Sequence, residues 1–469
     1  MTGAAPDERD VTHTPADDEL LTILRDWLPT RRWFPAKGVA ARLECIGGLT
    51  LADPRGEASV RVLLVRVRAP DIDSVLQVPV TLRPPAGLAP SAVIGSSADV
   101  CAAPSATRGR TELRDGVADP AFLRAWLAAA DGPGAVVDPD RARVLSGEQS
   151  NSSVVLPALE SATESATPAA ILKVFRTLTP GDNPDVDVPR ALAAAGWAHV
   201  ARPLAWLEAA WSVDGERVRG YLGVLSEFVP DAHDGFELAC SMVRRGESFT
   251  GLAASLGATI AEMHEALARA LPTPAPEPGL DRSGDLARSL RERFRWAAHS
   301  VPALDRYAAD VERLATGTRA LGIPPAPQRI HGDLHLGQVM HAATGWFVLD
   351  FEGEPLAPVT TRTRPDLALR DVAGMLRSID YAAAVGGSGG AAAPTAAERG
   401  WADEARRSLL TGYFRGPTRP DTETAVRALE VEKALYEAVY EARNRPTWLP
   451  VPLAALDRLL TPTTPVRPG

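Results

Sequence analysis

Two aspartates stand seventeen positions apart in the stretch RIHGDLHLGQVMHAATGWFVLDFEGEP, residues 329–355. Asp333 follows a histidine and a glycine, and Asp350 ends the apolar run WFVLD. The AATG between them predicts a tight turn, so the segment should fold into a hairpin that brings both acids to one edge. Phosphoryl transfer needs such a pair: one acid takes the proton of the attacking hydroxyl, and the other holds the metal on the phosphates. We therefore expect Asp333 to address the acceptor and Asp350 the metal.

The residues beside these acids follow an order found in protein kinases. Gln338 comes five positions after Asp333, where protein kinases place an amide ligand for a second metal ion. Asp350 is followed by Phe351 and Glu352, which is close to the Asp-Phe-Gly whose aspartate binds the metal. This pattern predicts that Gln338, Asp350 and Glu352 form a metal site.

The simplest alternative treats both aspartates as turn or cap residues, as most loop aspartates are. That interpretation does not explain why His331, His335 and Gln338 gather on the same loop. For His331 two roles stay open: contact with the substrate, or a structural hydrogen bond to the loop backbone.

A lysine upstream fits the same chemistry. Lys173 lies inside the apolar run AILKVFR, where a lysine is costly unless it has a partner. The run matches the V-A-I-K pattern, whose lysine pairs with the α- and β-phosphates of a nucleotide. An acidic partner is expected on the following helix, with Asp187 preferred and Asp185 as second choice. The alternative is an edge-strand lysine that extends its amine to water.

Two further segments have the position of nucleotide contacts. The polar stretch SGEQSNSSVV lies between two predicted strands, and its amides and hydroxyls, above all at Ser150, Asn151 and Ser152, could cover phosphates. A plain polar hairpin turn would look the same. The connector LSEFVP is the natural place for backbone contacts to adenine, from Glu227 to Val229.

The helix predicted over TAVRALEVEKALYEAVYEARN carries a polar stripe beside its apolar one. The stripe has tyrosines among charged residues: Glu432, Lys433, Tyr436, Glu437, Tyr440, Glu441 and Arg443. Aromatic faces flanked by hydrogen-bonding groups suit a carbohydrate, whereas the alternative is a solvated face of ordinary ion pairs. At the start of the helix LRDVAGMLRSIDYAA we expect a structural Asp371, which either caps the helix or bonds the loop that carries Asp333.

The elements that must position these residues predict an α+β protein. We expect a bilobal, protein-kinase-like fold with a strand-rich middle subdomain and a mostly helical C-terminal lobe that contains the hairpin. Proline- and alanine-rich stretches predict loops, at 156–170, 271–280 and 386–397. The expected division is a disordered terminus, an α+β cap, a nucleotide-binding N-lobe and a C-lobe for catalysis and sugar binding: 1–16, 17–106, 107–229 and 230–460.

Composition excludes several classes of protein. The net charge of -9 argues against non-specific nucleic-acid binding. Three widely spaced cysteines without a CxxC pair argue against a disulfide framework or a zinc site. The acidic N-terminus is no signal peptide, and no run is long and apolar enough for a membrane span. We therefore expect a cytoplasmic protein.

The chain resembles actinobacterial maltokinases from about residue 20 to 455. Five segments carry the resemblance: HGDLHLGQV, LDFEGEP, RDVAGMLRSIDYAA, YEAVYEARNRPTWLP and RRWFPAKG. HGDLH alone is shared with aminoglycoside phosphotransferases and choline kinases, whereas HLGQV with DFEGEP and the C-terminal segment is narrower. The resemblance implies a eukaryotic-protein-kinase-like fold with an N-terminal cap. It also implies an enzyme that uses ATP and Mg²⁺ to phosphorylate maltose at its anomeric hydroxyl, for glycogen-like α-glucan synthesis.

The same resemblance assigns roles to single residues. It makes Asp333 the base and Lys173 a phosphate ligand, and it gives magnesium to Gln338 and Asp350, with Glu352 assisting. The residues facing the sugar would be His331, His335, Lys433, Tyr436, Glu437, Tyr440 and Arg443. A partnership with trehalose synthase is a further implication.

Two other functions stay open. Relatives with this overall pattern phosphorylate glucosamine, and a glucosamine or aminoglycoside kinase would need a carboxylate near the ammonium, for which Glu432, Glu437 or Glu441 could serve. A catalytically silent kinase-fold binding protein should lack the base, the metal acid or the strand lysine, yet Asp333, Asp350 and Lys173 are all present.

Overall fold

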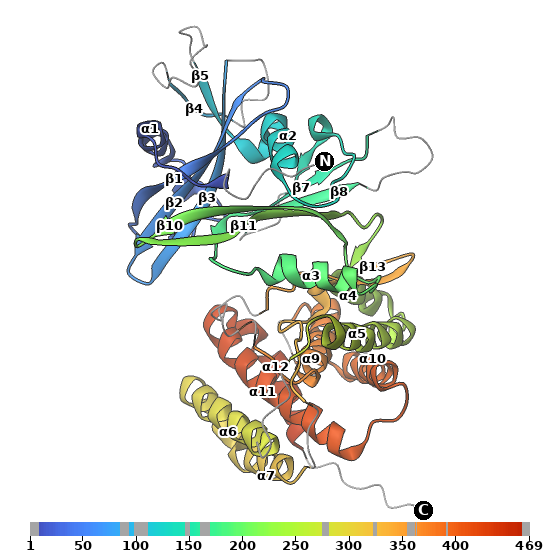
Figure 1. The fold of residues 1–469 in the computed structure, drawn as a ribbon. Coiled ribbons are helices and arrows are strands. Elements are labelled where there is room, and N and C mark those ends of the chain that lie inside the picture. The colour runs from blue at the N-terminus through green and yellow to red at the C-terminus, as the bar shows by residue number, and fades with distance from the viewer. Residues whose placement is uncertain are drawn as a thin grey trace, which may run out of the picture. The chain divides into compact units, whose positions relative to one another are not determined.

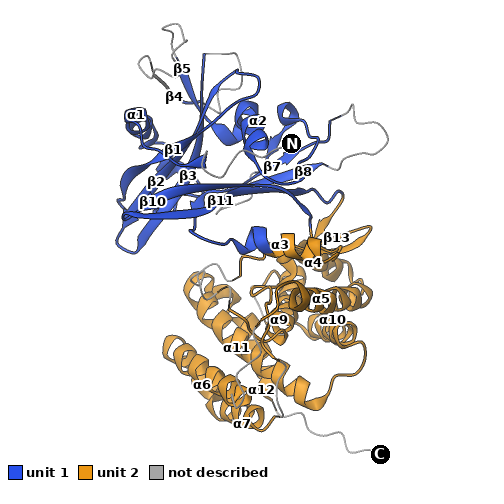
Figure 2. Cartoon of the chain, viewed as in Figure 1, with its two compact units in different colours: residues 1–187, 201–230 blue, residues 188–200, 231–469 orange. Residues whose placement is uncertain are grey.

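The computed structural model describes most of the chain: residues 9–84, 93–97, 111–145, 151–159, 169–273, 281–321, 326–353, 362, 364–390 and 393–461. Ser150 and Cys101 lie outside these residues. The contacts divide the chain into two compact units, shown in Figure 2. Unit 1 comprises 1–187 and 201–230, and unit 2 comprises 188–200 and 231–469. The boundary runs through helix α3 (Pro184–Ala194).

The cap of unit 1 is an antiparallel sheet in the order β1-β2-β3-β5-β4 (Figure 1). Its strands are β1 (Arg42–Leu51), β2 (Ser59–Ala69), β3 (Ile72–Arg83), β4 (Val93–Ser97) and β5 (Thr111–Asp115). The central strand β2 is buried on both faces. Leu63, Val65 and Val67 pack with the residues of helix α1 (Pro15–Leu24), while Val60, Val62 and Leu64 face a second core. The cap sheet therefore continues to residue 115, beyond the expected limit of 106.

The segment RRWFPAKG is part of this cap core. Trp33, Phe34 and Ala36 are buried beside α1, after the short helix η2 (Leu28–Thr30). The guanidinium of Arg176 lies 4.3 Å from the Trp33 ring centroid. Its aromatic residues are thus structural, because they close the first core of the cap.

The second sheet of unit 1 has the order β10-β11-β8-β7-β6. Its strands are β6 (Arg143–Val144), β7 (Asn151–Leu156), β8 (Ala170–Phe175), β10 (Pro203–Val213) and β11 (Glu216–Glu227). Helix α2 (Pro120–Ala129) packs with residues of both sheets in one core. Along the chain it lies between the short helices η4 (Gly116–Ala118) and η5 (Pro139–Arg141). The buried amide of Gln77 on β3 donates to Phe175 O and Leu222 O, both at 2.7 Å, and β9 (Thr177–Leu178) pairs with β3. The cap sheet and the second sheet of unit 1 thus share one core, whereas the sequence led us to expect two separate subdomains.

Unit 2 is mostly helical around one core. Its longer helices are α4 (Gly235–Arg245), α5 (Thr250–Ala270), α6 (Arg282–Ser300), α7 (Ala308–Arg319), α9 (Leu369–Ser388), α10 (Ala396–Phe414), α11 (Pro420–Asn444) and α12 (Pro450–Leu460). Short turns of helix are η6 (Pro302–Tyr307), η7 (Leu336–Gln338) and η8 (Pro446–Trp448). The expected hairpin is present as β13 (Val339–Ala342) and β14 (Gly345–Val348), with β12 (His233–Asp234) beside β13. The α+β class, with a strand-rich first part and a helical second part, is confirmed.

The expected loop at 386–397 is shorter than the sequence suggested. Helix α9 runs on to Ser388, and α10 begins at Ala396. The start of α10 is fixed by a capping box, in which Glu398 N donates to Thr395 Oγ1 at 3.2 Å and Thr395 N donates to Glu398 at 2.7 Å. That signal was readable as T-x-x-E in the sequence.

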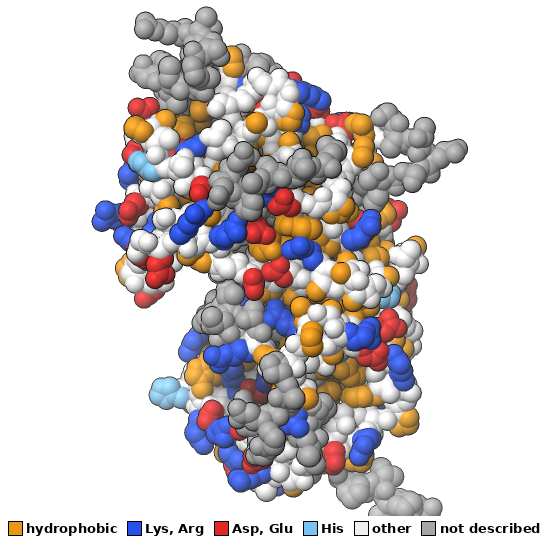
Figure 3. Space-filling view, in the orientation of Figure 1, with side chains coloured by type: hydrophobic (Ala, Val, Ile, Leu, Met, Phe, Trp, Pro, Cys, Tyr) orange, Lys and Arg blue, Asp and Glu red, His pale blue; other side chains and the backbone are white. Residues whose placement is uncertain are grey.

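The outer surface carries charges of both signs. On the faces seen in Figure 3, Lys and Arg side chains are interspersed with Asp and Glu side chains in each unit. Among the residues that the structure describes, no helix has the length and apolarity that crossing a membrane requires.

A buried charge network joins four helices of unit 2. Arg377 and Asp380 on α9 pair with each other, and Asp380 also accepts from Arg406 on α10 and from Arg458 on α12. Arg377 Nη2 donates to Glu437 on α11 at 2.7 Å. Burial alone would raise the pKa of Asp380, but the three surrounding guanidinium groups lower it to about 2. The network therefore favours one mutual packing of α9, α10, α11 and α12.

We predict that Asp380→Asn destabilises the protein by about 3 kcal/mol at pH 7, because three buried arginines lose their anion. The carboxylate's contribution is complete above its unfolded pKa, near 3.8, and is lost as pH falls toward the folded value of about 2. The difference in unfolding free energy between wild type and variant should thus shrink by about 2 kcal/mol over this interval. Denaturant unfolding at a series of pH values measures it.

The exposed Asp285, paired with Arg288 at 2.5 Å, offers a matched control, and Asp285→Asn should change stability by less than about 1 kcal/mol. A difference for Asp380→Asn that stayed constant down to the lowest pH would contradict the assigned electrostatic role.

Candidate active site

The loop that carries Asp333 is anchored by a buried carboxylate. Asp371, in the first turn of α9, accepts from His331 N at 2.8 Å and from Gly332 N at 2.9 Å. Of the two structural roles expected for Asp371, the structure shows the hydrogen bonds to the loop. Gly332 has a φ of +89°, a backbone conformation that glycine adopts readily, and the chain turns there toward Asp333.

A histidine also forms a hydrogen bond to this carboxylate. His264 Nε2 donates to Asp371 at 3.1 Å, and the other ring nitrogen lies 2.9 Å from the hydroxyl of Tyr413. Burial would raise the pKa of Asp371, but the hydrogen bond and charge of His264, with the loop amide, hold it below its ordinary value. The carboxylate thus stays ionised and keeps its grip on both amides.

The two loop histidines have structural positions. His331 is 1 % exposed; its Nε2 donates to Leu349 O at 2.8 Å, and its Nδ1 accepts from Asp333 N at 3.3 Å. Of its two open roles, the structural one is therefore observed, and the assignment to sugar contact is wrong because both ring nitrogens are occupied. His335 Nδ1 accepts from Gly337 N at 3.1 Å, so that this ring caps η7, and burial lowers its pKa.

The hairpin joins the segments that carry the two acids. Leu349 N donates to Gln338 O at 2.9 Å, and Leu349 O receives the hydrogen bond from His331. The next residue, Asp350, has a φ of +52°, a left-handed conformation that an aspartate tolerates and that is frequent at functional sites. Phe351 is buried, with its ring centroid 5.0 Å from that of His331.

These features fit a magnesium site on unit 2. Gln338, Asp350 and Glu352 supply amide and carboxylate oxygens, the hard donors that Mg²⁺ prefers. The left-handed turn at Asp350 redirects the chain directly after the strand, while Phe351 anchors it in the core. The donors thus stand on a backbone that is fixed on both sides.

A pocket opens beside Asp333 within unit 2. It is lined by Arg293, Gly332, Asp333, Leu334, Arg370, Asp371, Gly374, Leu429, Glu432, Lys433 and Tyr436. Lys433 Nζ lies 3.5 Å from Asp333 Oδ1 and 5.5 Å from the Tyr436 ring centroid. The Tyr436 ring stacks on Trp296 of α6, with centroids 6.2 Å apart and an interplanar angle of 17°. The pocket therefore combines a carboxylate, a cation and an aromatic wall.

Only part of the expected stripe on α11 reaches this pocket. Lys433 and Tyr436 line it, whereas Glu437 accepts from the buried Arg377. Tyr440 is 42 % exposed with Arg445 beside its ring, and Arg443 Nη2 donates to Ser300 at 3.3 Å. Tyr440, Arg443 and Glu437 therefore fit the interpretation of a solvated or ion-paired helix face better than a place in the pocket wall.

Sequence reasoning missed the contribution of other helices. Arg293 and Trp296 come from α6, and the Arg293 guanidinium lies 5.2 Å from the Trp296 ring centroid and 5.6 Å from that of Tyr436. Arg370 comes from α9 and pairs with Glu432 at 3.4 Å. The run RERFRW shows an aromatic among arginines, but the sequence does not show that this face of α6 meets α11.

The three acids of the α11 stripe have cationic or hydroxyl partners in the protein. Glu432 accepts from Ser289 at 2.8 Å as well as from Arg370. Glu437 accepts from Arg377, and Glu441 accepts from Arg445 at 2.8 Å. The carboxylates that could have received a ligand's ammonium are thus already neutralised by the protein.

On unit 1, Lys173 forms its ion pair with Asp185, and Nζ lies 2.5 Å from Oδ2. The preference for Asp187 as this partner is wrong, and the second choice is the observed one. Asp187 accepts from Tyr221 at 2.8 Å and from Asn183 N at 2.9 Å. Both acids lie in the first turn of α3, so a difference of two residues decides which side of the helix meets β8.

Three of the other expected nucleotide contacts on unit 1, Asn151, Ser152 and Glu227, are strand residues. Asn151 opens β7, and Ser152 is buried in that strand, where its hydroxyl accepts from Arg176 at 2.8 Å. This burial contradicts a phosphate contact by the Ser152 side chain. Glu227 ends β11 and pairs with Arg202 at 2.5 Å, and the half-buried Val229 follows two residues later.

Two families of known proteins match the chain. Residues 27–119 match the Maltokinase N-terminal cap domain, and residues 244–410 match the Phosphotransferase enzyme family. The first match covers the cap sheet and η4, and the second covers the loop, the hairpin and α9. Each family therefore matches one of the two parts that the structure distinguishes, without the second sheet of unit 1.

Two curated relatives with sequences similar to this chain are glucosamine kinases. One from Mycolicibacterium smegmatis is 29 % identical over 315 residues, which cover 62 % of this chain and 75 % of the relative. One from Streptacidiphilus jiangxiensis is 31 % identical over 287 residues, covering 58 % of this chain and 64 % of the relative, a little under two thirds of its length.

Solved structures agree in fold. A glucosamine kinase has a TM-score of 0.57 at 25 % identity, with 90 % of this chain and 94 % of that chain covered. A glucosamine kinase in complex with glucosamine, ADP and inorganic phosphate has a TM-score of 0.57 at 24 % identity, with 98 % and 100 % covered. These similarities confirm the kinase-like fold expected from the sequence.

We predict that Asp371→Ala frees the loop without unfolding the protein. Two buried amides and His264 lose their acceptor, so stability should fall by about 2–4 kcal/mol. Amide hydrogen exchange at His331 and Gly332 should rise more than the loss of global stability explains. Asp380→Asn on the same helix is the control, since it destabilises α9 but leaves the two loop bonds in place. Equal exchange in both variants would refute the anchoring role.

Proposed function

We propose that this chain, in which a maltokinase-type N-terminal cap precedes a phosphotransferase domain, is a maltose 1-kinase. It transfers the γ-phosphate of ATP to the anomeric hydroxyl of maltose, and the maltose 1-phosphate serves α-glucan synthesis. The matched cap domain supports this assignment. A cytoplasmic location and a partnership with trehalose synthase are expectations that follow from the same resemblance.

The charged groups of the pocket beside Asp333 are the reason for proposing a neutral sugar as the acceptor. An ammonium group entering it would meet Lys433 and Arg293, while Glu432 is already paired with Arg370. The other two acids of the pocket also have partners: Asp371 accepts from two amides and His264, and Asp333 lies 3.5 Å from Lys433 Nζ. A neutral sugar needs no free carboxylate, and its hydroxyls can bond to lysine and arginine while a ring face lies against Tyr436.

In the proposed reaction Asp333 is the general base. Its loop is held by Asp371 and His331, so the carboxylate is positioned before substrate binds. An Asp333 oxygen takes the proton of the sugar hydroxyl as the hydroxyl oxygen attacks the γ-phosphorus, and the bond from this phosphorus to the β,γ-bridging oxygen breaks to release ADP. Lys433, 3.5 Å from Asp333 Oδ1, orients the carboxylate and hydrogen-bonds the acceptor.

The remaining residues hold the nucleotide. Lys173 binds the α- and β-phosphates, and Asp185 orients its amine. Backbone groups at the end of β11, between Glu227 and Val229, contact adenine, and the amide of Asn151 is placed near the phosphates. Gln338, Asp350 and Glu352 hold magnesium, which neutralises charge on the phosphates when bound.

The second candidate is a glucosamine kinase. Two curated relatives and the two solved structures with a TM-score of 0.57 bear this name. It requires a carboxylate for the amine of the sugar, and every acid of the α11 stripe already has a partner in the protein. The two candidates thus differ in a measurable way, namely in the acceptor.

We predict that ADP release with maltose exceeds that with glucosamine or an aminoglycoside by about tenfold or more in kcat/KM, because an ammonium would meet the cations of the pocket. Phosphorus NMR of the product should place the new phosphate on the anomeric oxygen. Preference for glucosamine would establish the second candidate instead.

We predict that Asp333→Asn keeps the fold and nucleotide binding but lowers turnover by about 10²–10⁴-fold or more, as expected for loss of a positioned base. Steady-state kinetics and thermal unfolding test this together. Glu312→Gln, which removes a surface ion pair with Arg291, is the control and should leave turnover unchanged. An active Asp333→Asn enzyme would exclude the assigned role.

We predict that Asp185→Asn weakens ATP binding by about 10–100-fold, because the Lys173 amine loses its charged partner. Asp187→Asn should act mainly on stability, since its carboxylate bonds Tyr221 and Asn183 N. Calorimetric titration with ATP and magnesium compares the two variants. A larger loss of affinity in Asp187→Asn would reverse the assignment.

A further inference from the structure

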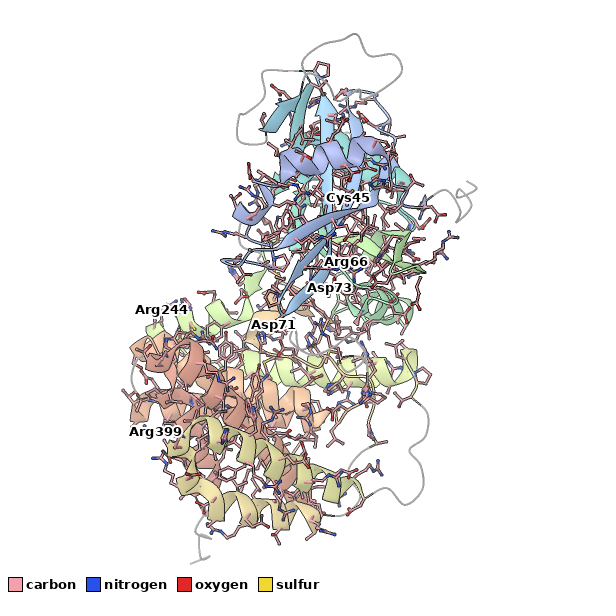
Figure 4. The ribbon with its side chains drawn as sticks, turned by 90° about the vertical axis from the view of Figure 1, so that its left-hand side faces the viewer. Cys45, Arg66, Asp71, Asp73, Arg244 and Arg399 are labelled. Atoms are coloured by element: carbon pink, nitrogen blue, oxygen red, sulfur yellow. The ribbon has the colours of Figure 1, made fainter. Side chains whose placement is uncertain are left out.

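Three side chains with metal-binding atoms converge on the cap of unit 1, and none belongs to the proposed reaction. His13 precedes α1, Asp18 lies in the first turn of α1, and Cys45 lies in β1. His13 Nε2 is 3.2 Å from Asp18 Oδ2, and the ligand atoms of all three residues lie within 4.8 Å of one another. Figure 4 shows Cys45 on the cap, next to α1.

The backbone fixes the two segments that carry these residues. Thr12 N donates to Gly48 O at 3.1 Å, and Gly48 N donates to Thr12 O at 3.0 Å, so the segment before α1 is bonded to β1 close to Cys45. Thr14 N donates to Asp17 at 2.8 Å, which sets the start of α1. The three donors therefore come together through main-chain pairing and not only through flexible side chains.

The guanidinium of Arg61, close to the site, is bound to other groups. Arg61 on β2 donates to both oxygens of Asp17, at 2.9 and 2.8 Å, and to Thr12 O at 2.7 Å. Its charge is thus balanced by Asp17, the buried neighbour of Asp18. His13 and Asp18 are exposed, so they can adjust their rotamers around an ion.

The donor set identifies the class of ion. A thiolate, an imidazole and a carboxylate are the ligands of zinc, at about 2.3, 2.0 and 2.1 Å from the metal. Magnesium and calcium prefer oxygen donors alone, so this set does not suit them. Donors around a tetrahedral zinc stand about 3.2–3.7 Å apart, so the observed spacing needs a shift of about 1 Å to close.

We propose that His13, Asp18 and Cys45 bind one zinc ion, with water in the fourth position. The ion would link the segment before α1 to the cap sheet. Cysteine spacing argued against a zinc site, whereas these ligands come from two segments, the one around the start of α1 and strand β1. Burial and the charge of Asp17 raise the pKa of Cys45 to about 11, so binding of a metal by the thiolate has to displace a proton.

Titration of the tag-free, chelator-treated full chain with Co²⁺ tests the proposal. One equivalent should bind and produce a thiolate-to-cobalt charge-transfer band, and Zn²⁺ should displace it and raise the unfolding temperature. Cys45→Ser should abolish the band, whereas Cys240→Ser, which changes a buried thiol of unit 2, should keep it. His13→Ala and Asp18→Asn should each weaken binding by about tenfold or more.

Two results would overturn the zinc site. One is a wild-type protein that gives no thiolate band with Co²⁺, which would leave an ordinary His13–Asp18 ion pair beside a buried thiol. The other is a band that persists in Cys45→Ser or keeps full affinity in His13→Ala. Retained secondary structure of each variant, measured by circular dichroism, shows that lost binding does not come from unfolding.

Discussion

The hydrogen bonds from His331 N and Gly332 N to the carboxylate of Asp371 are the constraint on which the rest of the site depends. A loop has no ladder of its own, and its buried amides need an acceptor. Asp371 supplies it from a rigid helix and is kept ionised by His264. The loop in turn places Asp333, and through the ring of His331 it is bonded to the end of the hairpin. One buried charge therefore sets the positions of both acidic segments.

The same helix, α9, transmits this order to the pocket wall. Two turns beyond Asp371, Arg377 bonds Glu437 of α11 and is buried beside Asp380. Buried charges of this kind contribute little net stability but penalise any other packing strongly, since each alternative leaves an ion unpaired. Helix α11 is thereby held with Lys433 and Tyr436 toward the loop. The acids of the α11 stripe are already engaged in ion pairs within the protein. The side of the pocket formed by this stripe therefore presents cations and few available anions.

The readable parts of the fold were those with strong local periodicity. The cap strands β1 to β3, the hairpin, and helices α5, α6, α9 and α11 follow from apolar spacing and turn residues alone. The start of α2 also had a local signal, Asp119 before Pro120, where the carboxylate accepts from Ala121 N, yet its role in a core shared by both sheets had none. Strand β2 alternates in sequence like a half-buried strand, but a second core covers its other face.

The sequence by itself determined the pattern on which the proposed chemistry rests: two aspartates and an amide at fixed spacing around a turn, and a lysine inside an apolar strand. These are local patterns, and local geometry is enough to interpret them. Only the tertiary structure decided which partner each polar group takes, as in the pairing of Lys173 with Asp185, the burial of His331 and the capture of Glu437 by Arg377. Residues three or four apart on a helix face one side, but which other helix or strand meets that side depends on how the whole core packs. That packing is a property of distant segments, so no single stretch of sequence contains it.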